Sequence, residues 1–194
     1  VLGEGDADND RFEVAGNTLR LQAGPALDFE TRSQYFVRLQ VTDGGGLSFS
    51  QAVVIQVRDV NESPISMSLG NSVVTEHTNT SAGPVEIGTL SAIDPDGGAF
   101  ANHTFTLVAG SGDADNGHYS ISGNKLQLKQ NETVNFESQP SYAVRVSVFD
   151  GANTVEQTLT VTVTDVNEAP TLDVGSAETS EDDPVVFTLS ANDP

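Results

Sequence analysis

The sequence predicts an all-β fold, a tandem array of Greek-key β-sandwiches of about seven strands each. The peptide Asp-Val-Asn-Glu-Ser-Pro at 59–64 returns as Asp-Val-Asn-Glu-Ala-Pro at 165–170, each time directly after a strand-like run. Apolar and polar residues alternate with a period of two, and no stretch has the apolar period of a helix. The repeat distance of 106 residues is too long for a solenoid unit and suits a small domain.

Further repeats divide the chain into modules. The segment Gly5–Asn9 recurs as Gly112–Asn116, and Leu90–Pro95 is echoed by Leu189–Pro194. One module is therefore complete, and a part of another module lies on each side of it. The predicted divisions are a C-terminal part of a module at 1–63, a complete module at 64–170 and an N-terminal part of a further module at 171–194.

The strands follow from alternation and turn signals. In the complete module two long strands form a hairpin around Asp150–Asn153, because apolar residues alternate from Tyr142 before this turn and from Val155 after it. The first module repeats the hairpin between Tyr35 and Val57. Helices should be nearly absent. Shorter strands are expected before the second hairpin at 73–76, 85–93, 104–108, 119–122 and 125–129.

Charge and composition restrict the partners. Eight basic residues against 28 acidic ones give a net charge of −20, which repels nucleic acid and anionic lipid and attracts cations. We therefore expect no nucleic-acid partner; an alternative is that the acidity only keeps an exported protein soluble. The absence of cysteine excludes disulfides and zinc-thiolate sites and fits a large exported bacterial protein. No long apolar run is present, so this segment should not insert into a membrane.

The repeated segments resemble the cadherin repeat, in the form found in bacterial surface proteins and large adhesins. The resemblance rests on four features: the stretch Gly112–Leu126, the Asp-Phe-Glu and Asn-Phe-Glu elements at 28–30 and 135–137, the long hairpin, and the linker Asp-x-Asn-x-x-Pro. It implies a cadherin- or immunoglobulin-like sandwich with calcium ions at each junction between modules. Calcium takes six to eight oxygen ligands, which a seam rich in carboxylates can supply.

The resemblance also implies a ligand set for each junction. At the central junction the expected ligands come from the first module, the linker and the next module: Asp28, Glu30, Asp59, Asn61, Glu62, Asp94, Asp96, Asn102 and Asp150. At the second junction they are Glu76, Glu137, Asp165, Asn167, Glu168 and Asp193. Asn135 replaces the first acid of the Asp-x-Glu pair at the second junction, which should lower the ligand charge there.

Several of these groups have a simpler interpretation. Asp150-Gly151 is a common hairpin turn, and Asp94-Pro95-Asp96-Gly97 is also a good turn sequence. The Asp-Ala-Asp-Asn loops at 6–9 and 113–116 lack the glutamate of an EF-hand and are expected to be ordinary turns. The histidines, His77, His103 and His118, do not repeat between modules and are expected to be solvated or in turns. We expect no enzymatic activity.

Two classes of function follow from these observations. The first is a segment of an extracellular or bacterial cell-surface adhesin, part of a membrane-associated parent protein, in which calcium at the junctions stiffens the array for homophilic cell adhesion. The second is a recognition module for cell-surface carbohydrate or for like modules on another chain. The chain has no tryptophan and only three tyrosines, so the exposed aromatic platform of a carbohydrate site is not expected.

Overall fold

The computed structural model describes residues 1–24, 26–96, 102–174, 179–182 and 189–193. It divides into two compact units. The first unit contains Val1–Glu62 and also the short segment with Pro95 and Asp96, and the second contains Ser63–Asp94 and the chain that follows that segment. Each unit is described by itself below.

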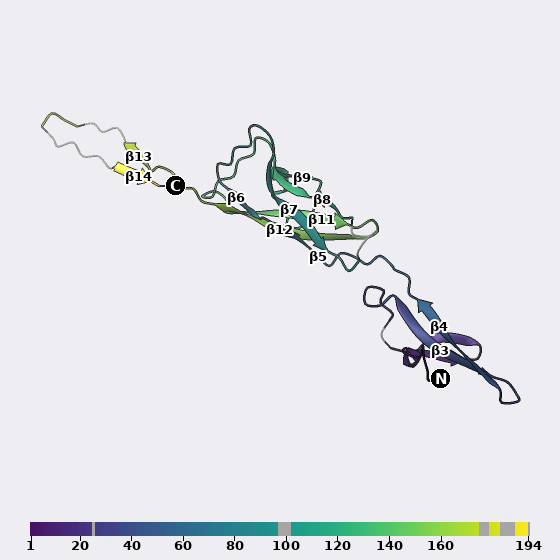
Figure 1. Cartoon of the computed structure of the whole chain (residues 1–194). Coiled ribbons are helices and arrows are strands. Elements are labelled where there is room, and N and C mark those ends of the chain that lie inside the picture. Colours follow the sequence, from purple (N-terminus) through teal and green to yellow (C-terminus); the bar gives the residue numbers. More distant parts are fainter. Residues whose placement is uncertain (25, 97–101, 175–178, 183–188, 194) are drawn as a thin grey trace. The chain divides into compact units, whose positions relative to one another are not determined.

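The second unit contains a sandwich of two four-stranded sheets (Figure 1). One sheet has the order β5 (Ser66–Leu69), β7 (Val85–Ile93), β10 (Lys125–Leu128), β9 (Tyr119–Ser122). The other has the order β6 (Val73–Thr75), β12 (Thr154–Thr164), β11 (Ser141–Phe149), β8 (Thr104–Leu107). The predicted all-β sandwich is confirmed, and the predicted bounds of β7 and β9 match the structure.

The first strand of this sandwich is divided between the two sheets. Its first part, β5, pairs antiparallel with β7, and its second part, β6, pairs parallel with β12 in the other sheet. Gly70 lies between the two parts, and the sequence pattern had predicted only the second. Ser66-Met67-Ser68-Leu69 alternates over only four residues, which is too short a run to stand out from a loop.

Alternation along the long hairpin builds the core. Val144, Val146 and Val148 of β11 are fully buried, as is Val161 of β12. Successive side chains of a strand point to opposite faces, so this period-two pattern places one apolar row between the sheets. Tyr119 of β9 is also fully buried and packs edge-on against Tyr142. The sandwich thus has one continuous apolar interior.

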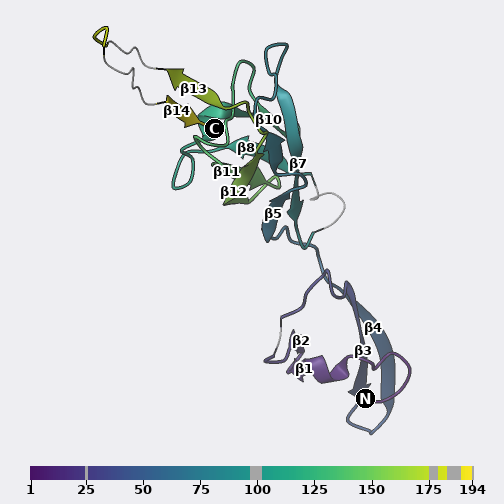
Figure 2. The same ribbon diagram turned by 90° about the vertical axis from the view of Figure 1, so that its left-hand side faces the viewer.

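The first unit repeats the back part of the sandwich. It contains a 3₁₀ turn, η1 (Asn9–Arg11), and two hairpins: β1 (Phe12–Ala15) with β2 (Thr18–Leu21), and β3 (Gln34–Thr42) with β4 (Ser48–Gln56) (Figure 2). Its core is small and consists of Phe12, Tyr35 and Val37 with partly buried neighbours. Val41 is 65% exposed although its counterpart Val148 is 0% exposed, because the described first unit has no counterparts of β5–β8 to cover it.

A short hairpin near the C-terminus repeats the start of the sandwich. Strand β13 (Thr171–Val174) pairs with β14 (Leu189–Asn192), and Thr171 lies opposite Asn192. In the sandwich Ser66 of β5 lies opposite Ile93 of β7. Counted from the linker prolines Pro64 and Pro170, Ser66 corresponds to Leu172, so the two antiparallel pairs differ in register by one residue. Strands β13 and β14 therefore repeat the antiparallel pairing of β5 with β7, shifted by one position.

The Asp-Ala-Asp-Asn loops serve the backbone in both units. The Asp8 carboxylate accepts hydrogen bonds from the amide of Phe36 at 2.7 Å and from the guanidinium of Arg32 at 2.5 and 2.7 Å. Asp115, before the second 3₁₀ turn η3 (Asn116–His118), accepts in the same way from the amide of Ala143 and the side chain of Gln139. This agrees with the interpretation of these loops as turns. Among the described residues no helix has both the length and the hydrophobicity of a membrane span.

Candidate metal centre

Four carboxylates gather within the first unit. Glu30, Asp59, Glu62 and Asp96 each offer a carboxylate oxygen within 4.8 Å of the others, and we call them the first acidic cluster. The linker is fixed to this cluster through its backbone, because the amide of Glu62 donates a 2.7 Å hydrogen bond to Asp96 Oδ2. All four residues belong to the ligand set expected for the central junction.

Burial and mutual repulsion raise the pKa of two carboxyls in this cluster. Burial raises the pKa of Glu62, and the hydrogen bond to Asp96 and the charge of Glu30 add to the effect. The backbone amide of Glu30 lowers the pKa of its own carboxyl, but burial and the charges of Asp59 and Asp96 outweigh it, so the net pKa is raised. Without a cation the carboxyls of Glu30 and Glu62 therefore resist ionisation.

The second unit contains a matching group. Glu76, Glu137, Asp165 and Glu168 again offer oxygens within 4.8 Å of one another, and we call them the second acidic cluster. Glu76 lies at its base and is 2% exposed. Its carboxylate accepts a hydrogen bond from the amide of Val166 at 2.6 Å and from that of Phe136 at 2.9 Å. These amides lower the pKa of Glu76, so it stays ionised.

Glu168 is the member of this cluster whose charge is compensated only in part, by His77 at 3.4 Å. Burial raises the pKa of its carboxyl, and the charges of Glu76 and Glu137 raise it further. Both of its carboxylate oxygens are buried, and neither has a hydrogen-bond partner among the described residues. Burying carboxylate oxygens without hydrogen bonds costs free energy. A bound cation would offset this cost at Glu168.

The two clusters share equivalent residues of the repeat. Glu30 corresponds to Glu137, Asp59 to Asp165, and Glu62 to Glu168. The asparagines between the linker acids also behave alike. Asn61 Nδ2 donates to the carbonyl of Glu62 at 2.9 Å, and Asn167 Nδ2 donates to the carbonyl of Glu168 at 3.1 Å. A repeat that preserves both the acids and this backbone contact reproduces one local geometry twice.

Other expected ligands have contacts of their own. Asp28 accepts hydrogen bonds from the amide and hydroxyl of Thr31, which lower the pKa of its carboxyl. Asp94 Oδ2 lies 2.8 Å from His103 Nε2. Asp150 is buried in the hairpin turn, where it accepts from the amides of Ala152 and Asn153. The structure thus gives Asp150 the turn role, and its role as a calcium ligand stays a prediction.

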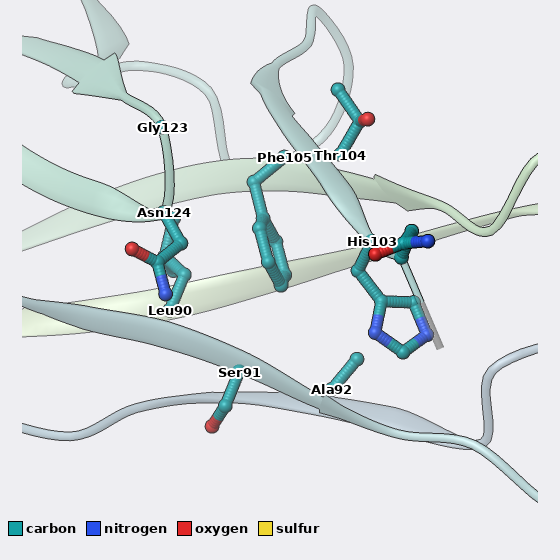
Figure 3. A pocket seen from close by; sticks show the side chains of 9 residues that line it. Leu90, Ser91, Ala92, His103, Thr104, Phe105, Gly123 and Asn124 are labelled. Carbon is teal, nitrogen blue, oxygen red and sulfur yellow. The ribbon is translucent and has the colours of Figure 1, made fainter. Parts of the chain in front are cut away.

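Two further expected ligands are exposed. Asp193 follows β14, and Asn102 precedes β8. Asn102 lines a hollow of about 500 Å³ between β7 and β8, in which the rings of His103 and Phe105 point toward the strand that carries Ser91 and Ala92 (Figure 3). Neither Asp94 nor Asp193 is a member of the acidic clusters.

The sequence interpretation missed the partners of the histidines. His103 pairs with Asp94, and His118 Nδ1 lies 2.7 Å from Glu132 Oε2. His77 lies beside the second acidic cluster, with Nδ1 3.4 Å from Glu168 Oε1. None of the three repeats between modules, so repetition could not reveal them; the only sequence signal was that His77 follows Glu76 directly.

Comparison with known proteins shows what part of the chain resembles. Residues 75–164 match the family model described as Cadherin domain. The matched segment begins one residue before Glu76 and ends one residue before Asp165, so residues of the second acidic cluster lie at both of its ends.

The relatives that the chain matches are much longer than the chain itself. Protocadherin Fat 2 of Rattus norvegicus is 30% identical over 171 residues, which cover 86% of this chain and 4% of that protein. Cadherin-related family member 2 of Homo sapiens is 26% identical over 206 residues, which cover 100% of this chain and 16% of that protein. The chain therefore spans a small part of the relatives it matches.

A solved structure agrees with the observed fold. The crystal structure of the Protocadherin GammaB4 extracellular domain has a TM-score of 0.63 at 24% sequence identity and covers 95% of this chain and 30% of that chain. This likeness supports the β-sandwich fold. The relatives named here are animal proteins, and they give no support to the predicted bacterial origin.

Proposed function

We propose that this chain is a calcium-binding segment of an extracellular adhesion protein, with calcium at both acidic clusters. The observation that carries the proposal is the repetition of the cluster. Four carboxylates converge in the first unit and four in the second, and three of the four are at equivalent positions of the repeat. An acidic group that served only solubility would gain nothing from convergence, because like charges at such distances repel one another.

The residues fit the ion that the cadherin family implies. Calcium prefers carboxylate and carbonyl oxygens and accepts irregular geometry. Glu30, Asp59, Glu62 and Asp96 would hold it in the first cluster. In the second cluster the oxygens of Glu168, which accept no hydrogen bond from a described residue, would join Glu76, Glu137 and Asp165. A bound calcium ion supplies two positive charges that neutralise these acids.

The linker residues of each cluster determine what binding does. Asp59 and Glu62 lie in an extended segment that follows β4, and Asp165 and Glu168 lie in the segment that follows β12. Ions that tie these segments to a folded module remove backbone freedom from the linker, which stiffens a tandem array. A stiff array can hold a distal adhesive module away from a cell surface, or present like modules to one another.

The proposal also includes an extracellular location and an adhesive partner for the parent protein. Calcium sites of extracellular modules have Kd values of about 0.1–1 mM, and sites of similar strength here would suit a segment outside the cell. We propose like modules on another chain as the adhesive partner. The bacterial host predicted from the lack of cysteine is no part of the proposal.

Carbohydrate recognition is the weaker alternative. Sugar sites usually present exposed aromatic rings, and Tyr35, Tyr119 and Tyr142 are 2%, 0% and 6% exposed. None of the tyrosines therefore offers a platform. The hollow beside His103 and Phe105 has polar neighbours, but Phe105 itself is buried in the core.

Calcium titration of the chelator-treated protein tests the proposal. Calorimetry should detect saturable binding with Kd values of about 0.01–1 mM, and calcium should raise the melting temperature. Asp59→Asn should remove binding at the first cluster only, and Asp165→Asn at the second only. Asp43→Asn, in the exposed turn between β3 and β4, is the matched control and should keep all sites. Absence of calcium binding in the parent chain would refute the proposal.

A further inference from the structure

The three histidines differ in how they meet their carboxylates. His103 Nε2 lies 2.8 Å from Asp94 and His118 Nδ1 lies 2.7 Å from Glu132, and both distances are those of direct hydrogen bonds. His77 Nδ1 lies 3.4 Å from Glu168 Oε1, and that oxygen has no hydrogen-bond partner among the described residues. Thus only His77 faces a buried carboxylate without bonding to it.

This spacing suits two ligands of one small cation. A tetrahedral zinc ion with bonds of about 2.0–2.1 Å holds its ligand atoms about 3.3–3.4 Å apart. Glu76 completes the group, because Glu76, His77 and Glu168 each offer a ligand atom within 4.8 Å of the other two. Each oxygen of Glu76 accepts one backbone amide, and a carboxylate oxygen has a second lone pair for a metal.

The group of Glu76, His77 and Glu168 is partly buried and is open to solvent on one side. Glu76 is 2% exposed and forms the floor of the group, whereas the His77 side chain is 56% exposed and opens it to solvent. The Glu168 oxygens are buried and accept no hydrogen bond from a described residue, and the nearest described cationic group is His77 at 3.4 Å. These oxygens are the independent sign of a missing ligand, since an acidic group at an open surface would be hydrated instead.

We propose that Glu76, His77 and Glu168 form a site for zinc or a similar borderline divalent cation, with water as the fourth ligand. Imidazole nitrogen is a ligand that zinc, copper and nickel favour and that calcium does not. The first acidic cluster consists of carboxylates alone, so this preference is confined to the second cluster. Zinc therefore competes with calcium at the second cluster and not at the first.

The inference uses two residues of the second cluster but does not depend on calcium binding there. Zinc can bind these three residues whether or not calcium is the physiological ion. The two proposals therefore fail separately, provided that zinc and calcium are titrated independently into the chelator-treated protein.

The test is titration of Zn²⁺ into the whole chain, with Co²⁺ as a spectroscopic substitute. His77→Asn is the decisive variant, because asparagine tolerates the positive φ of 56° at this position and leaves every carboxylate in place. It should weaken zinc binding at least about tenfold and abolish the visible absorption of nitrogen-bound Co²⁺. Calcium binding by this variant should stay within about twofold of the parent chain, since calcium makes little use of imidazole.

His118→Gln is the matched control. It removes another imidazole that lies beside a glutamate, and it should leave zinc binding unchanged. The inference is overturned if His77→Asn binds zinc as tightly as the parent chain, or if His118→Gln abolishes binding. Retained zinc binding together with absent calcium binding would refute the proposed calcium function and leave the zinc site standing.

Discussion

The amide of Val166 donates a 2.6 Å hydrogen bond to Glu76 Oε1, across 90 positions of sequence. The other oxygen of Glu76 accepts from the amide of Phe136 at 2.9 Å. A single buried carboxylate thus fixes three segments: the end of β6, the loop before β11, and the linker after β12. The second acidic cluster is organised around this residue.

Replacing Glu76 by glutamine should loosen all three segments. The amide side chain keeps one carbonyl oxygen, so one of the two backbone amides loses its acceptor in a buried place. We expect faster hydrogen exchange at the amides of Phe136 and Val166, a lower melting temperature, and at least a tenfold loss of calcium affinity at the second cluster, on the order expected for a lost metal contact. Glu4→Gln, at an exposed position, removes the same charge as a control. Unchanged exchange at both amides would contradict the assigned role.

The stability of the calcium-free protein should depend on pH in two stages. Burial, and then neighbouring carboxylates, raise the pKa of Glu62 and Glu168 above the ordinary value of 4.5, so between 4.5 and the raised values the folded state binds more protons than the unfolded chain. The free energy of unfolding should therefore increase as the pH falls from neutral into this window. Below 4.5 it should decrease, because the amides of Phe136 and Val166 lower the pKa of Glu76 and its protonation breaks their bonds.

Thermal melts across this pH range, with and without calcium, measure both stages. Calcium should remove the first stage, because the ion neutralises the same acids that protonation would neutralise. The double variant Glu62→Gln with Glu168→Gln should also flatten it. A calcium-free protein that loses stability steadily from neutral pH downward would show that repulsion in the clusters is unimportant.

Equivalent valines of the two repeats differ in burial, so one serves as the control for the other in a test of core packing. Val148→Ala, at a fully buried position of β11, should cost about 2–3 kcal/mol of unfolding free energy in the second unit. Val41→Ala, at the equivalent position of β3, should change stability by about 0.5 kcal/mol or less because Val41 is 65% exposed. Urea unfolding followed by residue-resolved NMR separates the units. Equal costs in both would mean that Val41 is covered in solution.

The partner of the buried aspartate differs between the two repeats, and substitutions can exchange it. Asp8 is 4% exposed and is bound by the Arg32 guanidinium, whereas the equivalent Asp115 is bound by Gln139. Arg32→Gln should destabilise the first unit by about 1–3 kcal/mol, because it leaves a buried carboxylate without its cation. The reverse change, Gln139→Arg, should stabilise the second unit by up to about 1 kcal/mol. A neutral Arg32→Gln, measured by exchange at the Phe36 amide, would show that the backbone bonds alone suffice.

Period-two alternation predicted the long strands well because their two faces meet different surroundings. In β11 the row from Tyr142 to Val148 faces the core, and the predicted β7 and β9 match the structure for the same reason. Strand β5 has only four residues, and its pairing depends on β7, which lies elsewhere in the chain. The pairing of distant segments cannot be seen in the local pattern, so this strand was missed. The front strands of the further module were expected at 171–194 because the sequence there repeats that of the complete module.

Repetition similarly predicted much of the candidate site. Glu30, Asp59 and Glu62 recur as Glu137, Asp165 and Glu168, and each set comes together in the structure. What repetition could not predict is which nearby acids satisfy the backbone instead, as Asp150 does in its turn. The contact between His77 and Glu168 was missed because the two residues are 91 positions apart in the sequence. The other repeat has no equivalent histidine that could have indicated it.

The parallel pairing of β6 with β12 determines how the sandwich responds to tension. The chain enters the sandwich through β5 and β6 and leaves it after β12, and Val73 lies opposite Thr162 with both strands running the same way. Pulling on the two ends therefore drags these neighbours past each other, so their ladder bonds share the load and do not open singly like a zipper. The Glu76–Val166 bond lies at the end of this ladder and is loaded along with it. We therefore expect this module to resist extension between its two ends more strongly than a sandwich whose terminal strands separate one bond at a time.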